Sequence, residues 1–244
     1  MTVKARLDGD GFDLETVGRI FNGGDVRVLK DSNGYYLTSP ALDAVAAKGG
    51  GVELLEVAQD HVLHINGAAR ALNSGYKPIR ATGRFNRPLP DGGEATEVVL
   101  SVDSIMMRST IGTPTISIGG VVVQPPPSPA QRWVELAPTN PDVRDMLSYL
   151  GRAEDDLSWD DLWKVFEIVR AAAAGGSNPA LVATGWVTAD DLDAFFASAN
   201  DPAVSGEGAR HARHRPRGKP SRAMPIHEGR EFARKLAKTW LETL

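Results

Sequence analysis

The residues best suited to chemistry lie in one basic stretch near the C-terminus, residues 208–223, with the sequence GARHARHRPRGKPSRA. It holds two histidines and six of the chain's 27 lysines and arginines, and it contains no acid. Guanidinium groups bind phosphate through paired hydrogen bonds, and a neighbouring histidine titrates near neutral pH. Nucleic-acid backbone is the natural partner of such a stretch. The six cations are Arg210, Arg213, Arg215, Arg217, Lys219 and Arg222.

Two other interpretations of this basic stretch stay open. Pro216 and Pro220 exclude a continuous helix, so the stretch is expected to be a loop between two helices. Such a loop is either solvated or paired with an acidic stretch of the same helical region, at residues 142–161. A protein partner is the remaining alternative. The acids Asp160 and Asp161 follow Ser158 and are interpreted as first-turn residues of a helix, where the helix dipole favours negative charge.

Other patterns of chemical interest are weaker. His61 and His64 are spaced to share one face of a helix, and Asp60 adds a third polar group, but no further metal ligand is identifiable. We interpret them as part of a polar helix face on which His61 or His64 meets solvent. The chain has neither a phosphate-binding glycine loop nor a nucleophile elbow. Because it contains no cysteine, disulfide scaffolds, thiolate zinc sites and cysteine nucleophiles are excluded.

Length and composition indicate an ordinary globular protein. The chain has 244 residues, 42% hydrophobic and 24% charged, with a formal net charge of −4. The N-terminus lacks the apolar core of a signal peptide, and no apolar run is long enough to span a membrane. A cytoplasmic protein is therefore expected.

The sharpest break in composition is QPPPSP at residues 124–129, where consecutive prolines favour an extended chain. We predict an α+β domain at 1–123, a Pro-rich linker at 124–138 and an all-α helical bundle at 139–244. The alternative is a stiff surface loop within one domain.

The N-terminal half mixes hairpins with helices. Apolar spacing predicts helices at 12–21 and 52–72, and Ser39-Pro40 opens a short helix that ends at Ala47. Asn33-Gly34 between β-rich runs predicts a hairpin. Strands are expected at 79–85 and 96–106, joined by a hairpin loop at Pro90-Asp91-Gly92-Gly93, with a further hairpin at 115–123. The predicted fold is a mixed α/β region in which hairpins pack on one long helix.

The C-terminal half is predicted to be all helix. Helices begin at Asn140-Pro141, at Ser158, at Thr188 and at Met224-Pro225. Ser158 with Asp161 resembles a capping box, and Thr188 with Asp191 repeats that pattern.

Three segments of this half carry a family resemblance: DLWKVFEIV, GWVTADDLDAFFASANDPAVSGEGARH and PIHEGREFARKLAKTWL. Together they resemble the C-terminal helical part of a widespread bacterial protein family, over about residues 140–244. That family is similar in outline to HEPN domains, which are four- or five-helix bundles that usually dimerise. Many of these cleave RNA without metal, using an arginine and a histidine separated by four to six residues.

The resemblance implies an RNA-directed, cytoplasmic homodimer of a bacterial defence or stress system, without a cofactor, a metal or a membrane. The implied activity is that of a metal-independent endoribonuclease, and the alternative is a non-catalytic interaction module for a protein or nucleic-acid partner. Arg210 and Arg222 would hold phosphate, while His211, His214 or His227 would transfer protons. Arg222 and His227 have four residues between them, and Arg210 and His214 have three. The predicted nucleic-acid-binding residues are Arg213, Arg215, Arg217 and Lys219.

Overall fold

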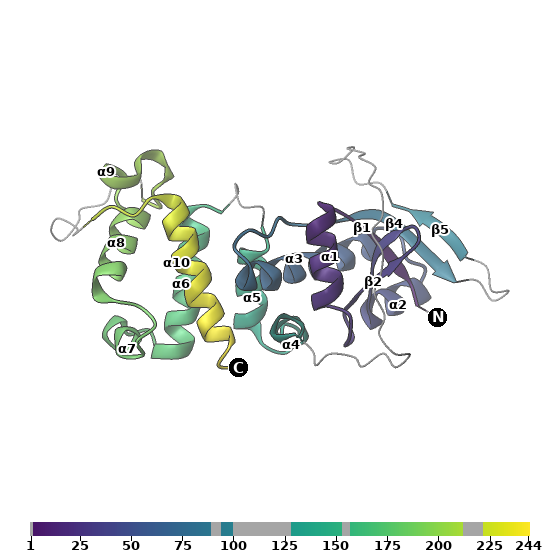
Figure 1. Ribbon diagram of the computed structural model, residues 1–244, viewed down its shortest axis with the longest axis horizontal. Coiled ribbons are helices and arrows are strands. Elements are labelled where there is room, and N and C mark those ends of the chain that lie inside the picture. The colour runs from purple at the N-terminus through teal and green to yellow at the C-terminus, as the bar shows by residue number, and fades with distance from the viewer. Residues whose placement is uncertain (1, 89–93, 100–127, 153–156, 212–221) are drawn as a thin grey trace. The chain divides into compact units, whose positions relative to one another are not determined.

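A computed structural model describes residues 2–88, 94–99, 128–152, 157–211 and 222–244 (Figure 1). It confirms the α+β class, because helices accompany a five-stranded antiparallel sheet. The chain divides into two compact units. Unit 1 comprises residues 1–61 and 79–132, and unit 2 comprises residues 62–78 and 133–244.

Unit 1 contains the sheet, whose strand order is β2-β3-β1-β4-β5. The strands are β1 (Lys4–Asp8), β2 (Arg27–Asp31), β3 (Gly34–Thr38), β4 (Arg80–Pro88) and β5 (Glu94–Val98). The Asn33-Gly34 turn joins β2 to β3, which confirms the hairpin predicted there. The hairpin predicted at 115–123 and residues 100–106 of the last predicted strand lie outside the described residues.

The helices predicted in this half are also confirmed. They are α1 (Gly11–Ile20), α2 (Pro40–Ala47) and α3 (Val52–Leu72), which contributes to both units. Asp10 caps α1 by accepting from the Phe12 N–H, and the Ser39 hydroxyl caps α2 by accepting from the Leu42 N–H.

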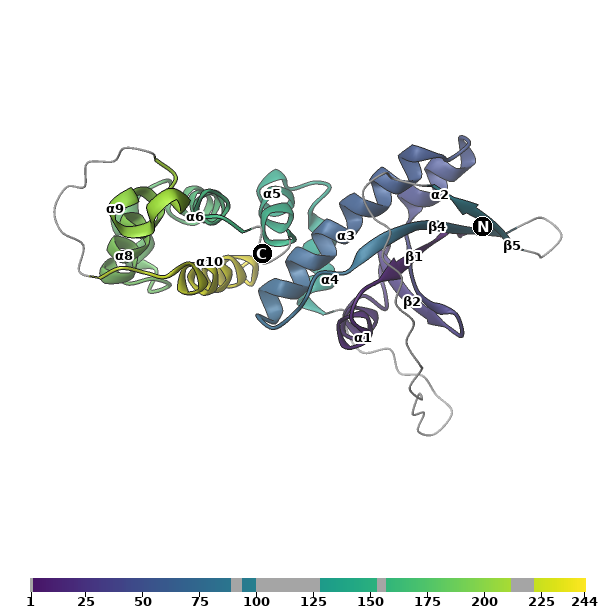
Figure 2. The ribbon, with the colours of Figure 1, turned by 90° about the horizontal axis from the view of Figure 1, so that it is seen from above.

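One face of the sheet is covered by helices and the other carries polar side chains. Along β1, Ala5 and Leu7 are buried, while Lys4, Arg6 and Asp8, which alternate with them, are partly exposed. Side chains alternate between the faces of a strand, so the buried set defines the covered face. Figure 2 shows α2 and the first half of α3 along one side of β1 and β4.

Unit 2 is helical, as predicted. Its main helices are α5 (Pro141–Leu150), α6 (Trp159–Ala174), α8 (Ala189–Asn200) and α10 (Ile226–Leu241). Asn140 caps α5, Ser158 and Asp161 form the predicted capping box of α6, and Thr188 caps α8. Short helices α7 (Asn178–Ala183), α9 (Pro202–Ser205) and η2 (Gly206–Gly208) lie between them.

The range expected as a linker contains a helix. Helix α4 (Pro129–Leu136) begins at the last proline of the proline-rich segment. The Ser128 hydroxyl accepts a hydrogen bond from the Gln131 N–H at 3.2 Å, and a proline is well tolerated in the first turn. Pro129 therefore opens a helix that Ser128 caps.

Candidate functional site

The structure describes four of the nine residues predicted to form the site: Arg210, His211, Arg222 and His227. His214 and the predicted binding residues Arg213, Arg215, Arg217 and Lys219 lie outside the described residues. Neither described arginine is hydrogen-bonded to His211 or His227 within the part of the chain that the structure describes.

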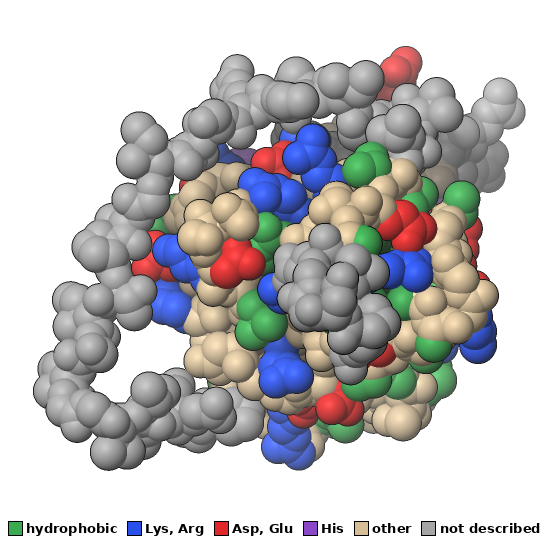
Figure 3. Space-filling view, turned by 90° about the vertical axis from the view of Figure 1, so that its right-hand side faces the viewer, with side chains coloured by type: hydrophobic (Ala, Val, Ile, Leu, Met, Phe, Trp, Pro, Cys, Tyr) green, Lys and Arg blue, Asp and Glu red, His purple; other side chains and the backbone are tan. Residues whose placement is uncertain are grey.

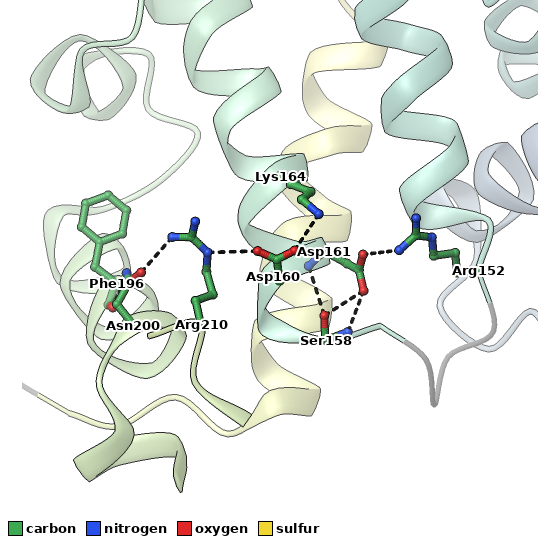
Figure 4. A network of polar contacts seen from close by, with 8 residues as sticks. All are labelled: Arg152, Ser158, Asp160, Asp161, Lys164, Phe196, Asn200 and Arg210. Carbon is green, nitrogen blue, oxygen red and sulfur yellow. Dashed lines mark hydrogen bonds and ion pairs between the residues drawn. The ribbon is translucent and has the colours of Figure 1, made fainter. Parts of the chain in front are cut away.

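Arg210 is held by unit 2 itself (Figure 4). Its Nε donates to Asp160 Oδ1 at 3.3 Å, and its Nη1 donates to Asn200 Oδ1 at 2.9 Å. Its guanidinium also lies 4.5 Å from the centre of the Trp163 ring, within cation–π range. The Arg210 side chain is only 20% exposed, and its guanidinium is occupied by these contacts within unit 2. The alternative in which the basic stretch pairs with the acidic stretch is confirmed for this residue.

Local sequence places Asp160 for this contact. The Ser158 cap sets the start of α6 and leaves Asp160 in its first turn, where it also pairs with Lys164 one turn later at 2.6 Å. The hydrogen bond from Lys164 is the largest of the effects that lower the pKa of Asp160. Burial opposes it by a smaller amount, and the hydrogen bond from Arg210 then adds to the lowering. The Asp160 carboxylate therefore links two cations of unit 2.

Arg222 is likewise paired with acids of unit 2. Its Nη2 donates to Asp191 Oδ1 at 3.1 Å, and its Nη1 forms an ion pair with Glu228. The hydrogen bonds to Glu228 and Asp191 raise the pKa of Arg222. Arg222 therefore has two carboxylate partners on α8 and α10.

Both ends of the basic stretch are attached to the last turn of α8. The backbone N–H of Arg210 donates to the Ala199 carbonyl at 2.8 Å, and that of Met224 donates to Ser198 Oγ at 2.7 Å. The acceptors are consecutive residues, so the two ends of the stretch lie close together. We infer that Arg210 and Arg222 hold these ends in place.

The two histidines of α3 do not form a joint polar surface. His64 is 5% exposed and its Nε2 lies 3.1 Å from Ser148 Oγ. His61 has its Nε2 3.0 Å from Ser39 Oγ. Of the two histidines, His61 is the one that is partly exposed, because α3 is covered by α5 at His64. Among the described residues, no group of three acids or histidines is arranged to hold a metal ion.

A cationic cluster that sequence reasoning missed lies on the sheet face opposite the one that α2 and α3 cover. The register pairs Arg6 with Tyr36, Asp8 with Arg80 and Lys4 with Asn86, so their side chains share one face. By the same alternation this face carries five cations, here called the cationic face: Lys4, Arg6, Arg27, Arg80 and Arg84.

Among the side chains that the structure describes, two acids of this face neutralise only part of its charge. Asp8 accepts from Arg80 at 2.8 Å, and Asp31 lies 3.9 Å from Lys4. Arg6, Arg27 and Arg84 form no ion pair within the described ranges. Figure 3, which faces the right-hand side of Figure 1, shows lysine and arginine side chains at several places on this end of the chain, with acids beside some of them.

The cationic face is hollowed around two of these arginines. A depression of about 440 Å³ is lined by Arg6, Asn33, Tyr36, Arg84, Asn86 and Thr96. The Tyr36 side chain forms part of its floor and is only 2% exposed. Arg6 Nη1 donates to the Tyr36 hydroxyl at 3.4 Å, and both Arg6 and Lys4 lie 5.9 Å from the ring centre. None of the described lining residues is acidic.

Comparison with known proteins finds no family model, no curated protein and no solved structure that matches the chain. In the part of the chain that the structure describes, no helix combines the length and apolar character needed to cross a membrane. The function is therefore argued from geometry and charge.

The ion pairs around Asp160 yield a pH prediction. We expect Asp160→Asn to lower the free energy of unfolding by roughly 0.5–1 kcal/mol at pH 7, since the carboxylate is largely solvated and surface pairs contribute little. The folded protein lowers the pKa of Asp160, so the stabilisation by its carboxylate is fully present at pH values above the ordinary pKa of an aspartate. This stabilisation is lost as the pH falls through the lowered pKa of the folded protein. Urea unfolding of wild type and variant at several pH values measures the difference.

The control for this measurement is Asp193→Asn. Asp193 is exposed on α8 and forms no ion pair among the described residues. We expect its effect to be smaller at pH 7 and to change less with pH. A difference between wild type and Asp160→Asn that stayed constant into strong acid would contradict the role assigned to the carboxylate.

Proposed function

We propose that the protein binds the phosphate backbone of nucleic acid on the cationic face of unit 1, and the HEPN resemblance of the C-terminal half favours RNA as that nucleic acid. The observation that carries the proposal is the set of three arginines on one sheet face, Arg6, Arg27 and Arg84, that lack a carboxylate partner among the described residues. A row of unneutralised cations attracts a polyanion, and guanidinium groups match phosphate geometry well.

The composition of the face favours contacts to phosphate over stacking with bases. Sheets that bind single-stranded RNA by stacking expose aromatic rings on the open face. Here Tyr36 is buried beneath Lys4 and Arg6, and Tyr35 lies on the other face, where its ring approaches Gly18 of α1. The groups that this face offers to a ligand are therefore cations, neutral hydrogen-bonding groups and the aliphatic side chains of Leu29 and Val98, with no exposed aromatic ring among the described residues. Binding of this kind depends on charge and is largely independent of sequence.

No RNA cleavage is assigned to the cationic face. Arg210 and Arg222, the arginines expected to steady a reacting phosphate, are each engaged by carboxylates of unit 2. The endoribonuclease activity implied by the HEPN resemblance stays a prediction. Incubating the full chain with labelled RNA in EDTA measures it directly.

Salt dependence tests the proposed binding. We expect a labelled single-stranded RNA to bind the full chain with an affinity that falls steeply between about 50 and 200 mM salt. Three phosphate contacts on a single strand predict a slope of about −2 in a plot of log affinity against log salt concentration, and further contacts would steepen it. Fluorescence anisotropy measures this slope. An affinity that stays level as salt rises, or no binding at the lowest salt, would overturn the proposal.

A further inference from the structure

The depression on the cationic face has a more specific chemistry than the face as a whole. It lies where β1, β3, β4 and β5 each contribute a side chain, together with Asn33 from the β2–β3 turn. Its volume of about 440 Å³ falls within the range of small-ligand sites, which is about 300–1,000 Å³. A continuous strand of nucleic acid would pass over such a depression, whereas the end of a strand or a single nucleotide could enter it.

Arg6 is held in position within the depression. The Tyr36 hydroxyl accepts from its Nη1, and the Tyr36 ring lies beneath its guanidinium. A Cβ atom at Gly34 would lie 3.4 Å from Arg6 Nη2, so the turn glycine leaves space beside this group. Gly34 also has a φ of 143°, which is strained for other residues. The hairpin turn and the tyrosine therefore fix one cation in advance of binding, which lowers the entropic cost of binding an anion.

Arg84 is the second cation of the depression. Its side chain is exposed, and it forms no ion pair within the described residues. Two guanidinium groups that line one depression without an acid repel each other, and an anion with two charges relieves that repulsion best. A backbone phosphodiester carries one charge, whereas a phosphate monoester carries about −1.5 to −2 at neutral pH.

The remaining lining groups are neutral and suit the nucleoside attached to such a phosphate. They are the amides of Asn33 and Asn86 and the hydroxyl of Thr96, which lies 3.5 Å from Asn86 Oδ1. Amide and hydroxyl groups can hydrogen-bond to sugar hydroxyls and base edges. On the basis of the proposed RNA binding, we infer that this depression takes the terminal phosphate monoester of an RNA strand.

The test compares one short RNA in three forms: 5′-phosphorylated, 3′-phosphorylated and with hydroxyl groups at both ends. At about pH 7.5 we expect one phosphorylated form to bind the full chain about tenfold more tightly than the hydroxyl form, as one additional charge contact worth about 1.4 kcal/mol predicts. The advantage should shrink towards pH 5, because the monoester loses its second charge near pH 6 while arginine stays charged.

Two variants locate the effect. Arg84→Gln should abolish the advantage of the phosphorylated strand, whereas Arg27→Gln, on the same face but outside the depression, should preserve it while weakening both forms equally. Both side chains are exposed, so both variants are expected to fold.

Each other outcome overturns the inference. Equal affinity for all three forms, with steep salt dependence retained, would overturn the terminal-phosphate site and leave the proposed backbone binding in place. If the wild-type chain bound none of the three RNA forms, both the terminal-phosphate site and the proposed backbone binding would be overturned. A nucleoside monophosphate that competes as well as the phosphorylated strand would identify a free nucleotide as the ligand. A phosphoserine peptide that competes better than either would identify a protein partner.

Discussion

Replacing Arg6, Arg27 and Arg84 together by glutamine is expected to weaken RNA binding about 100-fold at low salt. Each of these arginines lies on the cationic face without a carboxylate partner among the described residues. If each contact contributes about 1 kcal/mol, somewhat less than a typical hydrogen bond to a charged group, the loss is about 3 kcal/mol, or roughly two orders of magnitude in affinity. Fluorescence anisotropy with the same labelled RNA measures it.

Net charge alone also changes RNA affinity, so the control must remove three cations elsewhere. Arg144→Gln, Lys235→Gln and Lys238→Gln together make the same charge change on α5 and α10 of unit 2. We expect this control to lose less than about fivefold in affinity, because it lowers the long-range attraction of a polyanion by the same net charge but removes none of the proposed phosphate contacts.

A second comparison separates the two basic regions of the chain. Replacing Arg213, Arg215, Arg217 and Lys219 by glutamine removes the cations of the basic stretch that lie outside the described residues. If this variant lost the affinity and the variant of the cationic face did not, RNA binding would belong to the basic stretch and the sheet would be the wrong site. If each variant lost part of the RNA affinity and the losses added up when the substitutions were combined, both regions would contribute to RNA binding.

The largest effect on stability is expected from Gly67→Ala. Gly67 lies within α3, and a Cβ atom there would lie 2.1 Å from the backbone oxygen of Leu147 in α5. The backbones of α3 and α5 come close at a second glycine, because a Cβ atom at Gly151 would lie 2.0 Å from the backbone oxygen of Leu63. Alanine is preferred over glycine in a helix by about 1 kcal/mol, but a backbone obstacle cannot move without shifting a helix. We expect a net loss of about 2–3 kcal/mol.

Thermal unfolding measures this loss, which for a chain of this size predicts a Tm lower by about 5–10 °C. Gly11→Ala in α1 is the matched control, because a Cβ atom there meets nothing within 4 Å and its Tm should be unchanged or slightly raised. The Tm of Gly229→Ala should lie between the Tm values of these two variants. A Cβ atom at Gly229 would lie 2.5 Å from the Trp159 ring, which is a side chain and can adjust. A Gly67→Ala protein as stable as wild type would contradict the close packing of α3 and α5.

Local sequence determined most of the secondary structure of this protein. The capping box of Ser158 and Asp161, the Ser39-Pro40 start of α2 and the Asn33-Gly34 turn all depend on residues within four positions of one another. Interactions of that range can be inferred from the residues alone, because a side chain and the backbone amide that it caps are neighbours in the chain. Helical spacing likewise placed α3 from Val52 to Leu72.

The candidate site depended on contacts between distant residues. Arg6 and Arg84 line one depression because β1 lies between β3 and β4 in the sheet, and the pairing of β1 with β4 is irregular between Ala5 and Leu7. A shift of one residue in a strand moves its side chains to the opposite face. The sequence predicted that the strand at 79–85 forms a hairpin with the next strand, and β4 does pair with β5. It predicted neither the pairing of β4 with β1 nor the register, so it could not show which arginines would lie together.

The basic stretch shows the same limit. The sequence by itself determined that six cations lie between residues 208 and 223 without an acid, and this suggested an anion site. Only the tertiary structure decided that Arg210 binds Asp160 and Trp163 and that Arg222 binds Asp191 and Glu228. The physical reason is that the fold brings carboxylates of α6, α8 and α10 to these guanidinium groups, and a cation paired within the protein has little attraction left for phosphate.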